Sequence, residues 1–252
     1  LILDGAMGTM IQQYGLTEED FRGEQFKDVP GQMMGNNDIL CLTRPDVIAD
    51  IHRKYLEAGA DLITTCTFSS QRVSMADYGV ENDCREMNLA GAKIARQLAD
   101  EYTAKTPMKP RFVLGDVGPT NNTLSISPDV NNPALRSLTY DELVDAYTEQ
   151  MMALIEGGVD ALLIETIFDS LNAKAAIYAS EKAMDLIGRR LPLMLSITVS
   201  DTAGRTLSGQ TLEAFLASVQ HADIFSIGLN CSFGARQLKP FLKTLAEKAP
   251  YY

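Results

Sequence analysis

The chain has 252 residues, of which 46% are hydrophobic, enough for the core of one large domain or two small ones. It carries 22 Lys and Arg against 33 Asp and Glu, and this net charge of −11 argues against nucleic acid as a partner. No apolar run approaches the ~20 residues of a membrane span, and residues 1–4 lack the pattern of a signal peptide. We therefore expect a cytoplasmic protein with no nucleic-acid or membrane partner.

Residues 1–3 form a short predicted strand that runs into Asp4, Gly5 and Ala6. Asp-Gly is typical of a tight turn, because glycine accepts positive φ. The turn could also be functional, with a carboxylate at a strand end beside backbone N–H groups that could bind an anion. Residues 12–44 are polar, rich in glycine and without periodicity, which predicts a long loop.

After this loop, helical and strand patterns alternate to the end of the chain. Helices are expected over residues 45–58, 82–102, 139–156, 171–187, 211–220 and 235–248, and strands over residues 60–68, 112–117, 161–164, 193–199 and 224–232. Thr139 and Glu142 form a capping box at the start of the third of these helices. The segment 57–63 is repeated at 156–162, and in both places a helix stops at glycine and the chain enters an apolar strand.

Alternating strands and helices predict a parallel sheet. Polar residues gather at the carboxyl ends of the predicted strands, as in the active site of a (β/α)8 TIM-type barrel; they are Asp4, Thr65, Asp116, Glu165, Thr198 and Cys231. A doubly wound sheet would also place a ligand there, but usually with a Gly-rich phosphate loop, which the chain lacks. The expected fold is therefore the α/β barrel.

The barrel count does not close within the chain. About six βα units occupy it, and two more would need ~60 residues at ~30 per unit. Because a partial barrel has open edges, we expect residues 1–252 to be one barrel domain that is incomplete at the C-terminus, with the last two βα units absent.

Motifs at successive strand ends carry a resemblance to a known family. They are LDGAMGT at 3–9, GNND at 35–38, LTRP at 42–45, TFSS at 67–70, GDVGPT at 115–120, IET at 164–166 and GLNC at 228–231. These segments resemble the homocysteine S-methyltransferase family, and most of all the N-terminal homocysteine-binding modules of cobalamin-dependent methionine synthases. The resemblance spans the whole chain and implies that residues 1–252 are a homocysteine-binding barrel domain.

The resemblance implies zinc-dependent transfer of a methyl group to the thiol of homocysteine, giving methionine. Methylcobalamin on another module would supply the methyl group, so cobalamin-binding and methyltetrahydrofolate-binding modules of the same parent chain are the implied partners. Cys231 matches one of three zinc-binding cysteines of the family, and the other two, an adjacent pair, would follow Tyr252. The resemblance assigns the substrate ammonium group to Asp4 and Glu165, and the substrate carboxylate to the backbone at Gly5 and Ala6.

Physical chemistry agrees with these assignments. The thiolate is the nucleophile, a free thiol is mostly protonated at neutral pH, and zinc deprotonates a bound thiol. Glu165 could instead be a strand-end carboxylate in a salt bridge, and Cys231 a small buried thiol. Cys84 is expected in the core, and Cys66 at a strand end could line the pocket. His52, beside Arg53 and Lys54 on a predicted helix, and His221 are not expected to be ligands.

Other functions remain open at this point. The chain could be a methyltransferase that uses betaine or S-methylmethionine without a corrinoid. It could also bind homocysteine without chemistry, because its metal ligand set is incomplete and the fragment alone is expected to be inactive. A barrel aldolase would need a Schiff-base lysine at a strand end, and no predicted strand ends in lysine.

Overall fold

The structure is a computed structural model that describes residues 1–252. The chain divides into two compact units. Unit 1 comprises Leu1–Asp116 and Glu149–Ala161, and unit 2 comprises Val117–Thr148 and Leu162–Tyr252. The expectation of a single barrel domain over residues 1–252 stays a prediction, and each unit is described by itself.

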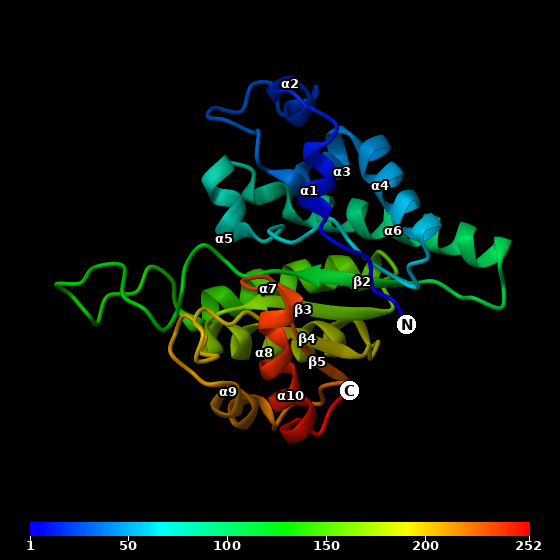
Figure 1. The fold of residues 1–252 in the computed structure, drawn as a ribbon. Coiled ribbons are helices and arrows are strands. Elements are labelled where there is room, and N and C mark those ends of the chain that lie inside the picture. Colours follow the sequence, from blue (N-terminus) through cyan, green and yellow to red (C-terminus); the bar gives the residue numbers. More distant parts are fainter. The chain divides into compact units, whose positions relative to one another are not determined.

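Unit 1 contains a parallel strand pair and a group of helices (Figure 1). The strands are β1 (Leu62–Thr64) and β2 (Phe112–Val117), and Leu3 forms a parallel bridge with Leu62. The helices are α1 (Met7–Gln12), α2 (Glu18–Arg22), η1 (Asn37–Ile39), α3 (Leu40–Thr43), α4 (Pro45–Ala58), α5 (Arg72–Met75), η2 (Ala76–Tyr78), η3 (Glu81–Asp83) and α6 (Cys84–Lys105). As predicted, α4 ends at Gly59, which has φ 109°.

The prediction of a long loop over residues 12–44 is wrong. This segment contains α2, η1 and α3, and its apolar side chains are buried in one cluster with α4 and α6. Phe21, Met33 and Leu40 are all less than 5% exposed. The helices were missed because each has only three to five residues, too few for a 3.6-residue period to emerge.

The repeat seen in the sequence corresponds to a repeated contact. Asp61 Oδ2 accepts a hydrogen bond from the backbone N–H of Ile2 at 2.8 Å. Asp160, at the equivalent position of the repeat, accepts one from the N–H of Val113, also at 2.8 Å. Each aspartate also pairs with a cation, Asp61 with Lys109 and Asp160 with Arg96. In both copies, an aspartate two residues after the helix-ending glycine therefore binds the backbone at the start of the preceding strand segment.

Unit 2 contains three parallel strands, paired in the order β3 (Ala161–Ile167), β4 (Leu193–Ile197) and β5 (Ser226–Leu229). Its helices are α8 (Ser170–Ile187), α9 (Leu212–Val219) and α10 (Ala235–Lys248). A further helix, α7 (Tyr140–Glu156), starts at the predicted capping box, where Thr139 N–H bonds to Glu142. Parallel pairing puts the carboxyl ends of β3, β4 and β5 at one edge of the sheet.

A long polar loop over residues 118–139 follows β2 and extends outward in Figure 1. Its base is fixed by two buried side chains at the start of α8. Asp169 accepts hydrogen bonds from Ser125 N–H and Oγ, and Asn172 accepts one from Leu124 N–H. Asp169 also caps α8 through the N–H of Leu171.

The outer edge of β5 is partly paired. Ile227 N–H donates to Tyr252 O at 2.9 Å, and Tyr252 N–H donates to Phe225 O at 3.2 Å. This alternation is the hydrogen-bond pattern of a parallel strand pair. The last residue of the chain therefore lies on β5 as a further strand would.

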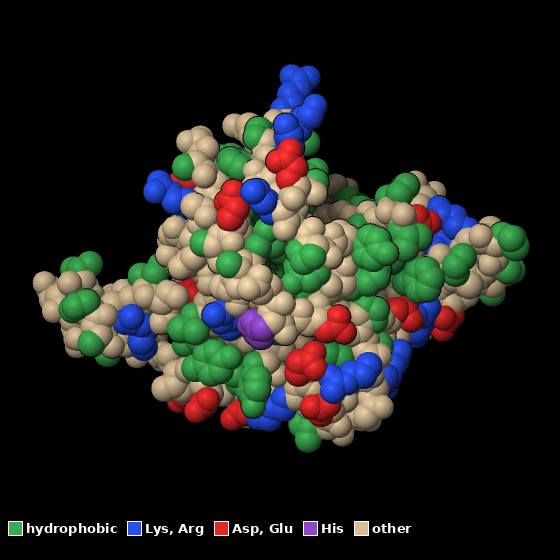
Figure 2. Space-filling view, turned by 90° about the horizontal axis from the view of Figure 1, so that it is seen from below, with side chains coloured by type: hydrophobic (Ala, Val, Ile, Leu, Met, Phe, Trp, Pro, Cys, Tyr) green, Lys and Arg blue, Asp and Glu red, His purple; other side chains and the backbone are tan.

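Charged side chains of both signs lie on the surface. On the face shown in Figure 2, Lys and Arg side chains are scattered among Asp and Glu and do not gather into a basic patch. None of the helices combines the length and the apolar character needed to cross a membrane.

His52 lies beside Arg53 and Lys54 in α4 but differs from them in burial. The side chain is completely buried in α4, and neither ring nitrogen has a hydrogen-bond partner. Burial lowers the pKa of His52 from 6.5 to about 4. The folded protein therefore holds this imidazole neutral, whereas the unfolded chain binds a proton below pH 6.5.

We predict that His52 makes stability fall at acidic pH. Between pH 6.5 and 4, His52 binds a proton in the unfolded state but not in the folded state. The free energy of unfolding therefore decreases as pH falls from about 6.5 towards 4, by roughly 3 kcal/mol in total. His52→Leu should remove this part of the pH dependence and should be at least as stable as the wild type at pH 7. Urea unfolding followed by circular dichroism at pH 7 and pH 4.5 measures it. Equal pH slopes for the two proteins would contradict the prediction.

Candidate functional site

Within unit 1, the predicted strand-end residues Thr65 and Asp116 come together. Thr65 Oγ1 accepts a hydrogen bond from Asp116 N–H at 2.9 Å and lies 2.6 Å from Thr67 Oγ1. Thr67 Oγ1 in turn donates to Asp116 O at 2.8 Å. All three residues are buried, so this network holds the ends of β1 and β2 together rather than presenting groups to solvent.

Asp4 lies beside the end of β1. Its carboxylate accepts hydrogen bonds from Thr64 N–H at 2.8 Å and from Thr64 Oγ1 at 3.1 Å. The adjoining Gly5 and Ala6 are exposed. A Cβ on Gly5 would lie 2.9 Å from the Tyr55 hydroxyl oxygen, which itself donates to Ala6 O. A larger residue at position 5 would have to displace the Tyr55 hydroxyl, and the backbone of the turn is accessible.

Within unit 2, the ends of β3, β4 and β5 meet at the side chain of Asn230. Asn230 Oδ1 accepts from Thr166 N–H at 3.1 Å and from Ser196 Oγ at 2.9 Å. Asn230 Nδ2 donates to Thr166 Oγ1 at 2.7 Å and to Cys231 Sγ at 3.4 Å. Thr198 Oγ1 also donates to Asn230 O. Thr198 and Cys231, two of the strand-end residues predicted from the sequence, are therefore part of one network.

The backbone at this edge has unusual geometry. Thr166, Cys231 and Ser232 have φ of 54°, 57° and 52°, and they are the only non-glycine residues of the chain with positive φ. Left-handed conformations cost L-residues of order 1 kcal/mol or more each, and they cluster at functional sites. The ends of β3 and β5 are therefore held in conformations that the local sequence does not favour.

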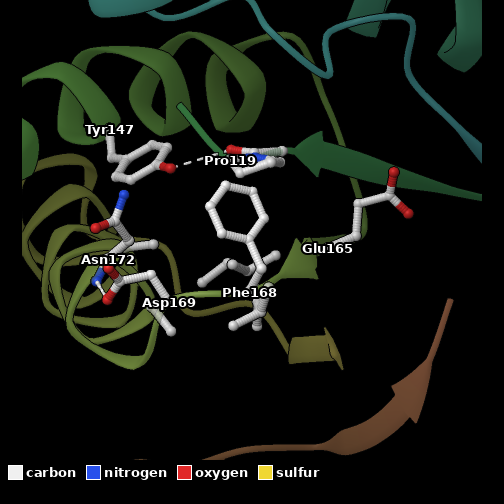
Figure 3. Close-up of a pocket in the computed structure, with 11 residues that line it drawn as sticks. Pro119, Tyr147, Glu165, Phe168, Asp169 and Asn172 are labelled. Atoms are coloured by element: carbon white, nitrogen blue, oxygen red, sulfur yellow. Dashed lines mark hydrogen bonds between the residues drawn. The ribbon is translucent and has the colours of Figure 1, made fainter. Parts of the chain in front are cut away.

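Glu165 precedes Thr166 at the same edge. It lines a small pocket with Pro119, Tyr147 and Phe168, and its carboxylate points away from the Phe168 ring (Figure 3). Asp169 and Asn172, at the other side of the pocket, are engaged in anchoring the loop over residues 118–139. Burial raises the pKa of the Glu165 carboxyl, and no cation of the chain offsets this effect. A half-buried carboxylate of this kind is suited to bind a cationic ligand group.

The four cysteines differ sharply in environment. Cys231 is exposed, whereas Cys41, Cys66 and Cys84 are buried. Cys84 lies in the core as expected, and its burial raises the pKa of its thiol to about 12. Cys66 does not present its thiol to a pocket, because its sulfur donates to Asn37 O, at the start of η1, over 3.6 Å. Cys231 is the thiol available to a ligand, which excludes its alternative interpretation as a buried side chain.

A zinc ion would find one ligand of the expected set here. The exposed thiol of Cys231 is a soft donor of the type that zinc prefers. Neither unit, however, brings together three Cys, His, Asp or Glu side chains as a metal site. Cys231 fits as one member of a ligand set and does not form a zinc site on its own.

The sequence reasoning missed the role of Asn230. It identified the Asn-Cys pair and the Glu165-Thr166 pair as motifs, but it gave the amide and the hydroxyl no function. The signal that could have found them is chemical, because an amide next to a strand-end thiol can donate to sulfur. That the same amide spans three strands depends on the register of β3, β4 and β5, which sequence patterns do not reveal.

Comparison with known proteins identifies the fold and the family. The structure matches the homocysteine methyltransferase MmuM from Escherichia coli in its metallated form, with a TM-score of 0.77 and 20% sequence identity over 99% of this chain and 80% of that chain. The oxidised form matches with the same TM-score and identity over 99% and 79%, and the apo form with a TM-score of 0.70 and 19% identity over 99% and 78%. The likeness confirms the expected α/β fold of the TIM-barrel type. The profile of the homocysteine S-methyltransferase family matches residues 1–252, and the chain belongs to that family.

Proposed function

We propose that this chain binds homocysteine and presents its thiol for methyl transfer, giving methionine. The observation that carries the proposal is in unit 2. An unpaired, half-buried carboxylate at Glu165 and an exposed thiol at Cys231 lie on strand ends that one amide joins. An amino acid with a terminal thiol has a complementary pair of groups, an ammonium and a sulfur.

Glu165 would bind the ammonium group. A cation beside this carboxylate would offset the cost of its burial and return its pKa towards the ordinary value. The family resemblance also predicts that Asp4 binds the same ammonium group and that the backbone at Gly5 and Ala6 binds the substrate carboxylate. These two assignments stay predictions. Their accessible turn and the fixed Asp4 carboxylate are compatible with these roles.

Cys231 would be one ligand of a zinc ion, with an adjacent cysteine pair beyond residue 252 as the further ligands. When bound, zinc would hold the substrate sulfur as a thiolate, the nucleophilic form. The part of this chain is to supply an accessible thiolate at a fixed position and to hold the amino-acid end of the substrate.

For the methyl donor we propose methylcobalamin on another module of a methionine synthase, alongside a methyltetrahydrofolate-binding module. The support is the similarity of motifs in this chain, GNND at 35–38 among them, to those of cobalamin-dependent methionine synthases. Betaine and S-methylmethionine are the alternative donors, and a donor assay separates the three. A homocysteine-binding module without activity is the second candidate, and the single thiol at the site favours it for residues 1–252 alone.

We predict that Glu165→Gln weakens homocysteine binding by about 1.5–3 kcal/mol, as for a hydrogen bond to a charged group. Wild-type affinity should also fall as pH drops through the raised pKa of Glu165, because the protonated carboxyl no longer attracts the ammonium. The variant should lack this pH dependence. Isothermal titration calorimetry between pH 5 and 8 measures both effects.

The matched control for this test is Glu213→Gln, which changes an exposed carboxylate on α9 of the same unit. It should bind homocysteine as the wild type does. Unchanged binding in Glu165→Gln would show that this carboxylate does not hold the substrate.

We predict that Cys231→Ala abolishes tight zinc binding in a polypeptide extended through the two further βα units. One of three thiolates would be lost, and methyl transfer from methylcobalamin should be lost with it because the substrate thiol would again be mostly protonated. Atomic absorption gives the zinc content, and product analysis gives the transfer rate.

Cys84→Ala is the control for the metal test. It removes a buried thiol in α6 and should cost about 1–3 kcal/mol of stability without changing zinc content or transfer. Full zinc occupancy and activity in Cys231→Ala would refute the assignment of Cys231.

A further inference from the structure

The side chain of Asn230 has a fixed orientation. Its Oδ1 accepts from a backbone N–H, that of Thr166, and from the Ser196 hydroxyl. A flipped amide would place Nδ2 against the Thr166 N–H, donor against donor. The NH2 group must therefore face Thr166 Oγ1 and Cys231 Sγ, the two acceptors on its other side.

The amide also joins two strained residues. Thr166 and Cys231, at φ 54° and 57°, belong to different strand ends, and Asn230 bonds to both. Strained conformations persist only when the surrounding structure imposes them. Thr166 is bonded through both its N–H and its hydroxyl, so the amide sets its backbone and its side chain together. The hydroxyl of Thr166 lies 3.9 Å from Cys231 Sγ and adds a second polar group on the sulfur.

We infer that Asn230 is a positioning residue that orients the Cys231 sulfur and sets its place relative to the residue after Glu165. The inference rests on the proposed function for the use of Cys231, but its test concerns the sulfur itself. The bonds of the amide to Thr166 and Ser196 tie the strand ends together, and its bond to Cys231 directs an N–H to the sulfur. Such a bond is strongest when the sulfur carries charge.

A purely structural role would involve the bonds to Thr166 and Ser196 and not the bond to the sulfur. Asn230→Asp separates the two roles, because its carboxylate can still accept from Thr166 N–H and Ser196 Oγ and can also accept from the Thr166 hydroxyl. The variant loses the donor and places an anionic oxygen where Nδ2 stood, 3.4 Å from the sulfur in the wild type. Ser196→Ala is the matched control, because it removes an acceptor-side bond and leaves the donor in place.

The experiment is alkylation of the native 252-residue chain with iodoacetamide at pH 7.5, followed at each cysteine by mass spectrometry. Only Cys231 is exposed, so its rate can be read separately from those of the three buried thiols. We expect Asn230→Asp to react at Cys231 roughly tenfold more slowly than the wild type, as for the loss of one charge-assisted hydrogen bond, and Ser196→Ala to react within about twofold of it. A rate in Asn230→Asp within twofold of the wild type would overturn the inference, even if its unfolding temperature fell.

A second measurement avoids the risk that Asn230→Asp fails to fold. Solvent exchange of the Asn230 side-chain amide protons is measured by NMR in the wild type and in Cys231→Ala. Exchange should be several-fold faster in the variant because an acceptor is lost, while the Asn172 amide protons should not change. Equal exchange at Asn230 would overturn the inference. Neither readout uses homocysteine or zinc, so failure of the proposed function would be seen separately, as an absence of homocysteine binding in the wild type.

Discussion

Parallel strand pairing is the constraint on which the site depends. Because β3, β4 and β5 run in the same direction, residues that follow each strand in the sequence meet at one edge. Thr166 and Cys231 are 65 residues apart along the chain. The Asn230 amide nevertheless bonds both to Thr166 and to the Cys231 sulfur. The same constraint in unit 1 brings Thr65 to Asp116.

The start of the strands is controlled as closely as their ends. In unit 1, Asp61 and Asp160 each accept a backbone N–H near the start of the preceding strand segment, from Ile2 and Val113. Each aspartate also pairs with a cation. These contacts fix the starts of the two strand segments of unit 1 and so determine which residues lie at their carboxyl ends. In unit 2, the strained backbone at Thr166 and Cys231 lies at the carboxyl ends of the strands, where barrel enzymes place their active sites.

Features with a local cause could be predicted from the sequence. The glycine stop of α4, the capping box at Thr139 and the repeat around Asp61 and Asp160 each depend on residues close in the chain. The short helices over residues 12–44 could not, because their stability comes from burial of Phe21 and Leu40 against distant helices. The burial of His52 could not be predicted either, because its neighbours Arg53 and Lys54 are charged and the packing of α4 decides which of its residues are buried. Among the site residues, Cys231 and Glu165 were found as motifs, whereas the role of Asn230 required the register of three strands.

The central claim is that Glu165 recognises the ammonium group of homocysteine. The most direct test compares L-homocysteine with 4-mercaptobutanoate, which has the same thiol and carboxylate but no ammonium group, on the wild type and on Glu165→Gln. The account predicts that the wild type binds homocysteine at least tenfold more tightly, a preference worth about 1.4 kcal/mol, and that Glu165→Gln loses most of that preference. An equal preference in both proteins would contradict the account, because the ammonium group would then be recognised elsewhere.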